Sequence, residues 1–145
     1  MKKILLIATG GTIASGYTED GLAPRILAED LLQYVEEYRE FCEVDVLQLF
    51  KLDSTNICGG HWLELSRLIE SEYEAYDGFV ISHGTDTMAF TAAALSYLIQ
   101  NSRKPIVITG SQKPIDLPAT DARTNLLDGL RFASQDRAHG VSIVF

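Results

Sequence analysis

A pair of glycines lies between two threonines in the segment ATGGTIAS, where Thr9 and Thr12 flank Gly10 and Gly11 directly after an apolar run. A threonine hydroxyl can act as a nucleophile when a neighbouring group accepts its proton. Paired glycines let the backbone approach a ligand closely, but after a strand they more often form a simple turn. Residue types and spacing leave both interpretations open: one threonine is a nucleophile, or both belong to a turn.

The glycine segment lacks the spacing of the common phosphate-binding loops. A dinucleotide-binding loop needs Gly-x-Gly-x-x-Gly, which Gly10, Gly11 and Thr12 do not supply. A P-loop needs Gly-Lys-Ser/Thr, but Gly16 is followed by Tyr17. The chain also has no Gly-x-Ser-x-Gly nucleophile elbow. These absences count against a nucleotide ligand.

A second polar cluster, HGTDT, follows a short apolar run and contains Thr85, Asp86 and Thr87. Any of these three side chains can cap the free N–H groups at the start of a helix. Equally, Asp86 can receive a ligand's ammonium group while a neighbouring hydroxyl positions a water or relays a proton. Spacing alone does not choose between these interpretations. We expect His83 to be a structural hydrogen-bonding residue, since no Ser-His-Asp or Cys-His arrangement surrounds it.

A third polar cluster, Asp53-Ser54-Thr55-Asn56, is equally ambiguous. Asx and Ser turns use these residue types freely, so a simple loop is one interpretation. A site for a zwitterionic amino acid needs a carboxylate for the ammonium group and donors for the carboxylate. The hydroxyl and backbone N–H of Ser54 can supply those donors.

Apolar periodicity predicts the elements that position these clusters. Continuous apolar runs predict five strands, at residues 3–8, 44–50, 78–82, 105–109 and 141–145. Helical stripes predict four helices, through Leu31, Leu32, Val35 and Tyr38; Trp62, Leu65, Ile69 and Tyr76; Met88, Ala92, Leu95 and Ile99; and Leu126, Leu130 and Ala133. We expect Trp62 and the tyrosines at helical spacing to lie in the core.

This alternation predicts an α/β domain with an open, mainly parallel sheet and helices on both faces, in a Rossmann-like or flavodoxin-like three-layer arrangement. In such sheets the functional loops lie beyond the carboxyl ends of the strands. All three polar clusters follow predicted strands, as does Gly110-Ser111-Gln112-Lys113. They therefore converge on one sheet edge, which indicates a site for a small polar ligand. The last strand has no following loop, so we expect the chain to be one domain of a longer protein.

Composition and charge exclude several classes of protein. The 145 residues are 46% hydrophobic and 22% charged, which is typical of one globular domain. A net charge of −8 argues against nucleic acid and anionic membranes as partners.

The first apolar run is shorter than the ~7–15 residues of a signal-peptide core, so we expect a cytoplasmic protein. Cys42 and Cys58 have no metal-binding spacing and are expected to be free thiols; no metal cluster is predicted.

Four segments in chain order resemble the L-asparaginases: ATGGTIAS, LDSTN, ISHGTDTMAFTAAALSYL and TGSQKPIDLPATDARTN. The resemblance spans the whole chain and is strongest to the cytoplasmic bacterial (type I) group. It implies that residues 1–145 are the nucleophile-bearing N-terminal α/β domain of an L-asparagine amidohydrolase. Such an enzyme gives L-aspartate and ammonia and needs neither cofactor nor metal. The resemblance also implies a smaller C-terminal domain, absent from this chain.

The same resemblance implies roles for the first glycine segment. Thr12 is the nucleophile that attacks the side-chain amide to form an acyl-enzyme, and Thr9 belongs to the turn. Gly10 and Gly11 let the backbone approach the substrate, with N–H groups available to a developing oxyanion.

The resemblance assigns the remaining site residues to the other two clusters. Thr85 belongs to a second catalytic group together with a lysine. Asp86, also placed with the catalytic residues, binds the substrate ammonium group. Ser54 binds the α-carboxylate, and Asp53 and Thr55 are substrate-binding neighbours.

Two departures from the family pattern stand out. The family often carries a tyrosine on a mobile loop near the position of Leu22, whereas Tyr17 lies five residues after Thr12, so its role stays open. The family's catalytic lysine lies beyond Phe145, and Lys113 belongs to a different loop. We therefore expect the isolated chain to be inactive. The resemblance also implies that the full-length protein is a homodimer or homotetramer acting on L-asparagine.

Other functions remain open. A glutaminase, or an amidase subunit that feeds ammonia to an aminoacyl-tRNA amidotransferase, would carry similar motifs. A side chain longer by one methylene changes binding by only ~1–3 kcal/mol in an apolar pocket. A non-catalytic amino-acid-binding module is the alternative from a different class.

Overall fold

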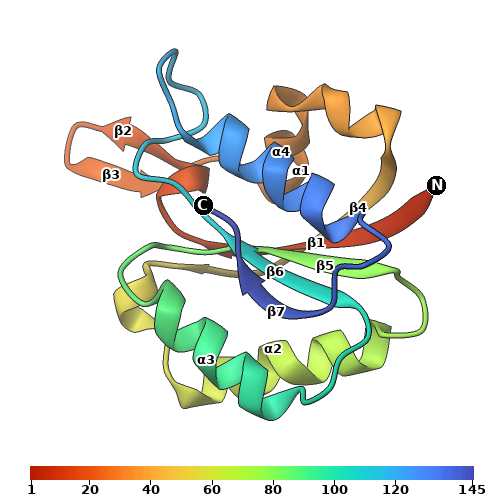
Figure 1. Cartoon of the computed structure of the whole chain (residues 1–145). Coiled ribbons are helices and arrows are strands. Elements are labelled where there is room, and N and C mark those ends of the chain that lie inside the picture. The colour runs from red at the N-terminus through yellow and green to blue at the C-terminus, as the bar shows by residue number, and fades with distance from the viewer.

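The apolar runs form one five-stranded sheet in which every neighbouring pair of strands is parallel (Figure 1). The computed structural model describes residues 1–145, except for the side chain of Pro24. The strands are β1 (Lys2–Gly10), β4 (Cys42–Leu52), β5 (Gly78–Ser82), β6 (Pro105–Thr109) and β7 (Gly140–Ile143). Their order across the sheet is β4-β1-β5-β6-β7. This is the flavodoxin-like order, and it confirms the predicted α/β class.

The order reverses at β1, which pairs with β4 on one side and β5 on the other. In doubly wound sheets the crevice beyond this switch point is where ligands bind. The loops that leave β1 and β5 therefore occupy the position at which a site is expected. These loops carry Thr12 and Thr85.

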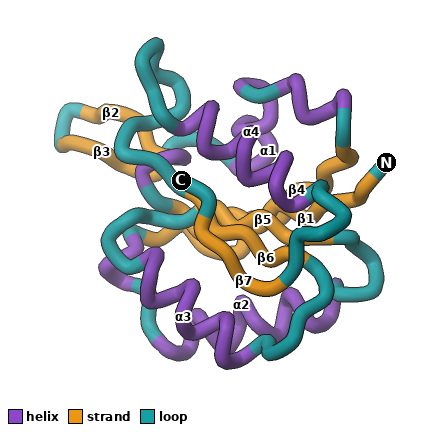
Figure 2. Tube along the Cα trace, viewed as in Figure 1, coloured by secondary structure: helices purple, strands orange, loops and turns teal.

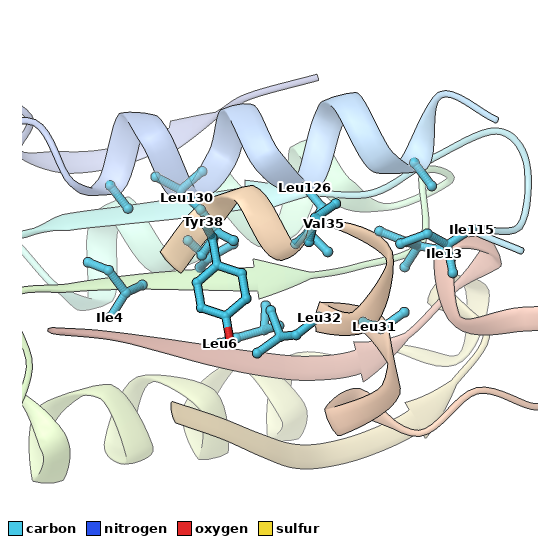
Figure 3. Packing of buried hydrophobic residues seen from close by; sticks show 14 of the residues in the cluster. Ile4, Leu6, Ile13, Leu31, Leu32, Val35, Tyr38, Ile115, Leu126 and Leu130 are labelled. Atoms are coloured by element: carbon cyan, nitrogen blue, oxygen red, sulfur yellow. The ribbon is translucent and has the colours of Figure 1, made fainter. Parts of the chain in front are cut away.

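Helices cover both faces of the sheet. Figure 2 shows the strands between two layers of helices. One layer contains α2 (Gly59–Glu72) and α3 (Met88–Leu98), and the other contains α1 (Ala28–Leu31) and α4 (Ala122–Ala133). Successive residues of a strand point to opposite faces. Ile4 and Leu6 accordingly pack in the cluster with Leu126 and Leu130 of α4 (Figure 3), whereas Leu5 packs in the cluster on the other face. Burial on both faces is the reason that the central strands are continuous apolar runs.

The predicted helix through residues 31–38 is broken into three pieces. α1 is followed by the 3₁₀ helices η2 (Leu32–Tyr34) and η3 (Glu36–Glu40), and Val35 between them has the non-helical torsions φ −141° and ψ 42°. Leu32, Val35 and Tyr38 are nevertheless buried (Figure 3). Their spacing of three residues matches the three residues per turn of a 3₁₀ helix. The buried stripe was therefore predicted correctly, but the continuous helix was wrong.

A two-stranded hairpin after Thr12 was not predicted. β2 (Ser15–Thr18) pairs antiparallel with β3 (Gly21–Pro24), and the hairpin projects at the carboxyl edge of the main sheet (Figure 1). Thr18 Oγ1 donates to Gly21 O at 2.7 Å, and Gly21 has a φ of 114°, which favours glycine at the turn. The short segment between Thr18 and Gly21 was the available signal.

The bounds of three strands also differ from the prediction, among them β4, which covers Cys42–Leu52 rather than residues 44–50. β1 continues to Gly10, so Thr9 lies in the strand rather than in a turn; its Oγ1 donates to Ser82 O of β5 at 2.8 Å. β7 covers Gly140–Ile143 rather than residues 141–145. None of the helices in the described chain has the length and apolar character needed to cross a bilayer.

Candidate active site

A pocket of about 320 Å³ opens at the carboxyl edge of the sheet, beyond β1, β4 and β5. Its lining comes from the loops after these strands, from the hairpin, and from the loop after β6. The lining residues are Gly11, Thr12, Ser15, Leu22, Leu52, Asp53, Ser54, Gly84, Thr85, Asp86 and Gln112. The lining thus includes two threonines, two serines and two aspartates.

The pocket brings together most of the site residues predicted from the sequence. Thr12, Ser54, Thr85, Asp86, Asp53 and Gly11 all line it. Thr55 and Tyr17 are exposed and do not belong to the lining. Ser15 and Leu22 were not predicted to line the pocket, because the hairpin that carries them was not predicted.

Close backbone contacts hold the loops together. Gly11 has a φ of 82°, and a Cβ added there would lie 2.5 Å from Gly84 N. A Cβ on Gly84 would lie 2.7 Å from both Cβ and Oγ of Ser54. Side chains at these two positions would collide with the neighbouring loop. The three loops can therefore converge only because Gly11 and Gly84 have no side chain.

Gly84→Ala is expected to displace Ser54 and destabilise the protein by about 1–3 kcal/mol, because the Ser54 Cβ is fixed to its backbone. Thermal or denaturant unfolding measures this change. Gly59→Ala is the matched control, since a Cβ at Gly59, the first residue of α2, meets no heavy atom within 4 Å. Equal stability of the two variants would contradict the close-packing account.

The structure corrects one part of the prediction for Gly11. Its backbone N–H donates to Leu52 O at 3.1 Å. This N–H therefore joins the end of β1 to the end of β4 and is not available to an oxyanion. Ser15 Oγ donates to Gly11 O at 2.9 Å, which ties the same residue to the start of the hairpin. Thr12 follows at the beginning of the 3₁₀ helix η1 (Thr12–Ala14) and is half-buried at the pocket wall.

Asp53 shapes the loop after β4. Its Oδ1 accepts from both the backbone N and the Oγ1 of Thr55, each at 2.9 Å, and so caps the 3₁₀ helix η4 (Ser54–Asn56). These hydrogen bonds lower the pKa of Asp53, with the backbone bond as the largest cause. The Asx-turn interpretation thus describes the contacts of Asp53 and Thr55.

Ser54 is the buried member of this loop, with 3% of its surface exposed. Thr87 Oγ1 donates to Ser54 O at 2.7 Å. This bond joins the loop after β4 to the loop after β5. It fixes Ser54 relative to Thr85 and Asp86.

His83 is buried, and its hydrogen bonds confirm the predicted structural role. Nδ1 lies 2.6 Å from Gly84 O, and Nε2 lies 2.8 Å from Thr91 Oγ1. Burial lowers the pKa of His83, and the hydrogen bond to Gly84 only partly opposes this effect. The neutral ring is therefore favoured in the folded protein.

Acidification below about pH 6.5 is expected to destabilise the fold through His83. The unfolded chain binds this proton at a higher pH than the folded chain, so the free energy of unfolding falls as the pH falls toward the lowered pKa. Tm measured against pH for wild type and His83→Gln tests this effect. The wild type should show the steeper loss of Tm below about pH 6.5. Parallel curves would contradict it, since His61 and His139 are present in both proteins.

Lys113 does not contribute to the pocket. Its Nζ donates to Ala119 O at 3.2 Å, and its backbone N donates to Asp121 Oδ1 at 3.1 Å. The side chain thus belongs to the loop before α4. This agrees with the prediction, which gave Lys113 no catalytic role. Over the described residues no group of three or more His, Cys, Asp or Glu side chains is placed to hold a metal ion.

The fold and the pocket define a class: an α/β domain that presents clustered hydroxyls and carboxylates at the switch point of a flavodoxin-like sheet. The family model described as "Asparaginase, N-terminal" matches residues 3–145. The chain therefore belongs to the asparaginase family. It is 43% identical over 132 residues to the L-asparaginase of Thermococcus kodakarensis, covering 90% of this chain and 40% of that protein.

A second kind of relative carries the same domain. A subunit of the Glutamyl-tRNA(Gln) amidotransferase of Archaeoglobus fulgidus is 38% identical over 135 residues, covering 92% of this chain and 32% of the relative. The chain thus spans less than half the length of either curated relative.

Solved structures share the fold along nearly the whole chain. The T. kodakarensis L-asparaginase structure has a TM-score of 0.89 at 41% identity. L-asparaginase I from Vibrio cholerae has a TM-score of 0.90 at 34% identity, and a probable cytoplasmic L-asparaginase from Campylobacter jejuni has 0.86 at 31% identity. Each comparison covers 99% of this chain and 44% of the other chain.

Proposed function

We propose that this chain is the N-terminal domain of an L-asparagine amidohydrolase, which converts L-asparagine to L-aspartate and ammonia. The observation that carries the proposal is the convergence of Thr12, Ser54, Thr85 and Asp86 on one pocket. The similarity to L-asparaginases of several organisms supports it. The V. cholerae structure, an L-asparaginase I, supports placing the protein in the type I group.

In the proposed reaction, Thr12 Oγ attacks the carbon of the side-chain amide. A C–O bond forms, the C–N bond breaks, and the amide nitrogen leaves as ammonia after taking up a proton. Water then adds to the resulting ester, releasing aspartate and restoring the Thr12 hydroxyl. Thr85 relays protons together with a lysine from the remainder of the protein. No metal or cofactor takes part in these steps.

The oxyanion needs donors other than the Gly11 N–H, which is bonded to Leu52 O. Thr12 opens a 3₁₀ helix, and the first N–H groups of a helix lack intrahelical acceptors. We assign Thr12 N–H to the oxyanion. Such donors are effective because they are fixed before the charge develops.

The ammonium and α-carboxylate groups of the substrate contact complementary groups of the pocket in this proposal. Asp86 carries the negative charge that pairs with the substrate ammonium group. Ser54, held by Thr87 and Gly84, offers a hydroxyl to the α-carboxylate. Asp53 contributes chiefly by shaping the loop, and Thr55 assists it from outside the pocket.

Tyr17 is proposed to approach the substrate from the hairpin. It pairs with Leu22 across β2 and β3, and directly opposed residues lie on the same face of a two-stranded sheet. Leu22 lines the pocket, while Tyr17 is 60% exposed. The hairpin can therefore present the phenol next to the pocket mouth.

The relatives that are amidotransferase subunits favour a second candidate: an amidase domain that supplies ammonia to glutamyl-tRNA(Gln). In that case a dedicated partner would receive the ammonia. The two candidates share the same nucleophile and pocket. They differ in whether turnover of free L-asparagine is accelerated by a tRNA-binding partner protein.

The whole protein is proposed to be a cytoplasmic homodimer or homotetramer with a smaller C-terminal domain. The similarity to the probable cytoplasmic enzyme of C. jejuni supports the location, and the greater length of the relatives supports a further domain. Because the lysine partner of Thr85 lies outside this chain, residues 1–145 alone are proposed to be inactive.

Ammonia release from L-asparagine and L-glutamine tests the proposal, using the full-length protein beside residues 1–145 alone. Turnover of L-asparagine by the full-length protein only is the expected result. A preference for L-glutamine would favour a glutaminase instead. Saturable binding of L-asparagine without any turnover would replace the enzyme by an amino-acid-binding module.

A further inference from the structure

A chain of side-chain hydrogen bonds runs from α2, through α3, to the loop after β5. Trp62 Nε1 donates to Thr91 Oγ1 at 2.9 Å, Thr91 Oγ1 lies 2.8 Å from His83 Nε2, and His83 Nδ1 lies 2.6 Å from Gly84 O. Thr91 and His83 are almost completely buried, with 0% and 1% of their surfaces exposed. Trp62 is half-buried and belongs to neither core cluster, so its predicted core role was wrong.

The direction of every hydrogen bond in this chain is determined by chemistry. Gly84 O can only accept, so His83 Nδ1 carries the proton. In the neutral ring Nε2 is then an acceptor, and the Thr91 hydroxyl donates to it. Trp62 Nε1–H can only donate, and it satisfies the Thr91 oxygen from the other side. Donors aligned head to tail in a buried site strengthen one another.

This chain fixes the orientation of one peptide group at the pocket. Gly84 O and Thr85 N–H belong to the same planar unit, and the described chain has no cis peptide bond. In a trans peptide the C=O and N–H point in opposite directions. Because Gly84 O is bonded to the buried imidazole, Thr85 N–H points away from it. Gly84 and Thr85 both line the pocket.

We propose that Trp62, Thr91 and His83 are positioning residues, which hold the Gly84–Thr85 peptide so that Thr85 N–H and the adjoining Thr85 and Asp86 side chains are presented to the substrate. The inference rests on the proposed function of this pocket. Within the described part of the chain Thr85 N–H has no hydrogen-bond partner, as expected of a donor reserved for a ligand. Thr91 lies outside the pocket lining, so it acts only through His83.

The test compares Thr91→Val with Thr91→Ser in the full-length protein. Valine keeps the shape of the side chain but removes the hydroxyl, which leaves His83 Nε2 and Trp62 Nε1 without this partner. We expect kcat for L-asparagine to fall about 10- to 100-fold, with a smaller change in KM, because a misplaced donor affects the transition state most. Serine retains the hydroxyl and is expected to restore most of the kcat.

Two further variants separate positioning from general destabilisation. Trp62→Phe removes one donor at the half-buried end and is expected to lower kcat less than Thr91→Val. Ser96→Ala is the matched control on α3, because this exposed hydroxyl donates only to Ala93 O within its own helix. It should leave kcat unchanged. All rates are measured well below each variant's Tm.

Amide hydrogen exchange of residues 83–87 gives a readout that needs no activity. Thr91→Val should speed exchange in this segment, and Thr91→Ser should not. If the wild type hydrolyses neither L-asparagine nor L-glutamine, the proposed function fails, and exchange alone then decides the positioning proposal. The positioning proposal would be overturned if Thr91→Val showed the kcat and the amide exchange of the wild type. It would also be overturned if kcat fell as far in Thr91→Ser as in Thr91→Val.

Discussion

Thr12→Ala in the full-length protein is expected to lower kcat for L-asparagine by roughly 10⁴-fold or more, since removing a catalytic nucleophile leaves only binding and oxyanion stabilisation. The affinity for L-asparagine should change little, because Ser54 and Asp86 are the residues proposed to bind the distal groups of the substrate. Ammonia release gives kcat, and calorimetric titration with L-asparagine gives the Kd of the inactive variant.

Thr12→Ser is the matched control for this prediction. Serine keeps a hydroxyl at the start of η1, and it should retain far more activity than alanine. If Thr12→Ala keeps kcat within about tenfold of wild type, the nucleophile is another residue, and Thr85, the other threonine that lines the pocket, is the first candidate. A protein without turnover but with unchanged binding in both forms would instead be a binding module.

Asp86→Asn is expected to lower kcat/KM for L-asparagine about 100-fold, which corresponds to about 2.7 kcal/mol. The substitution keeps the size of the side chain but removes the charge that is proposed to pair with the substrate ammonium group. Steady-state kinetics of ammonia release measures the loss.

A substrate without the α-amino group supplies the control for Asp86. Succinamic acid keeps the amide and the carboxylate of L-asparagine but lacks the ammonium group. Wild type and Asp86→Asn should hydrolyse it at similar rates, because the missing pair is lost from both sides of the comparison. An equal loss on both substrates would show that Asp86 acts on the fold or on catalysis rather than on the ammonium group.

Local sequence patterns predicted the centre of the fold well. Residues 78–82 and 105–109 are strands with the predicted bounds, because central parallel strands are buried on both faces and must be apolar throughout. The segment around Val35 was harder to predict, because the same apolar stripe fits an α-helix with 3.6 residues per turn and a 3₁₀ helix with three. The hairpin was missed because its strands have four residues each and little apolar character.

The candidate site was likewise predicted only in part. Thr12, Ser54, Thr85 and Asp86 could be placed together because each follows the carboxyl end of a parallel strand. Individual hydrogen bonds could not be predicted in this manner. Trp62 and Thr91 are 29 residues apart and meet only through the packing of α2 on α3. The bond between Gly11 N–H and Leu52 O likewise depends on the register of β1 and β4, which no local pattern encodes.

The central claim is that Thr12 forms a covalent ester with the aspartyl group of the substrate. Acid quenching of the full-length enzyme during turnover of L-asparagine, followed by peptide mapping by mass spectrometry, tests it most directly. We predict an aspartyl adduct on the peptide that contains Thr12, and none on the peptide that contains Thr85. An adduct confined to a peptide without Thr12, or sustained turnover by Thr12→Ala, would contradict the account.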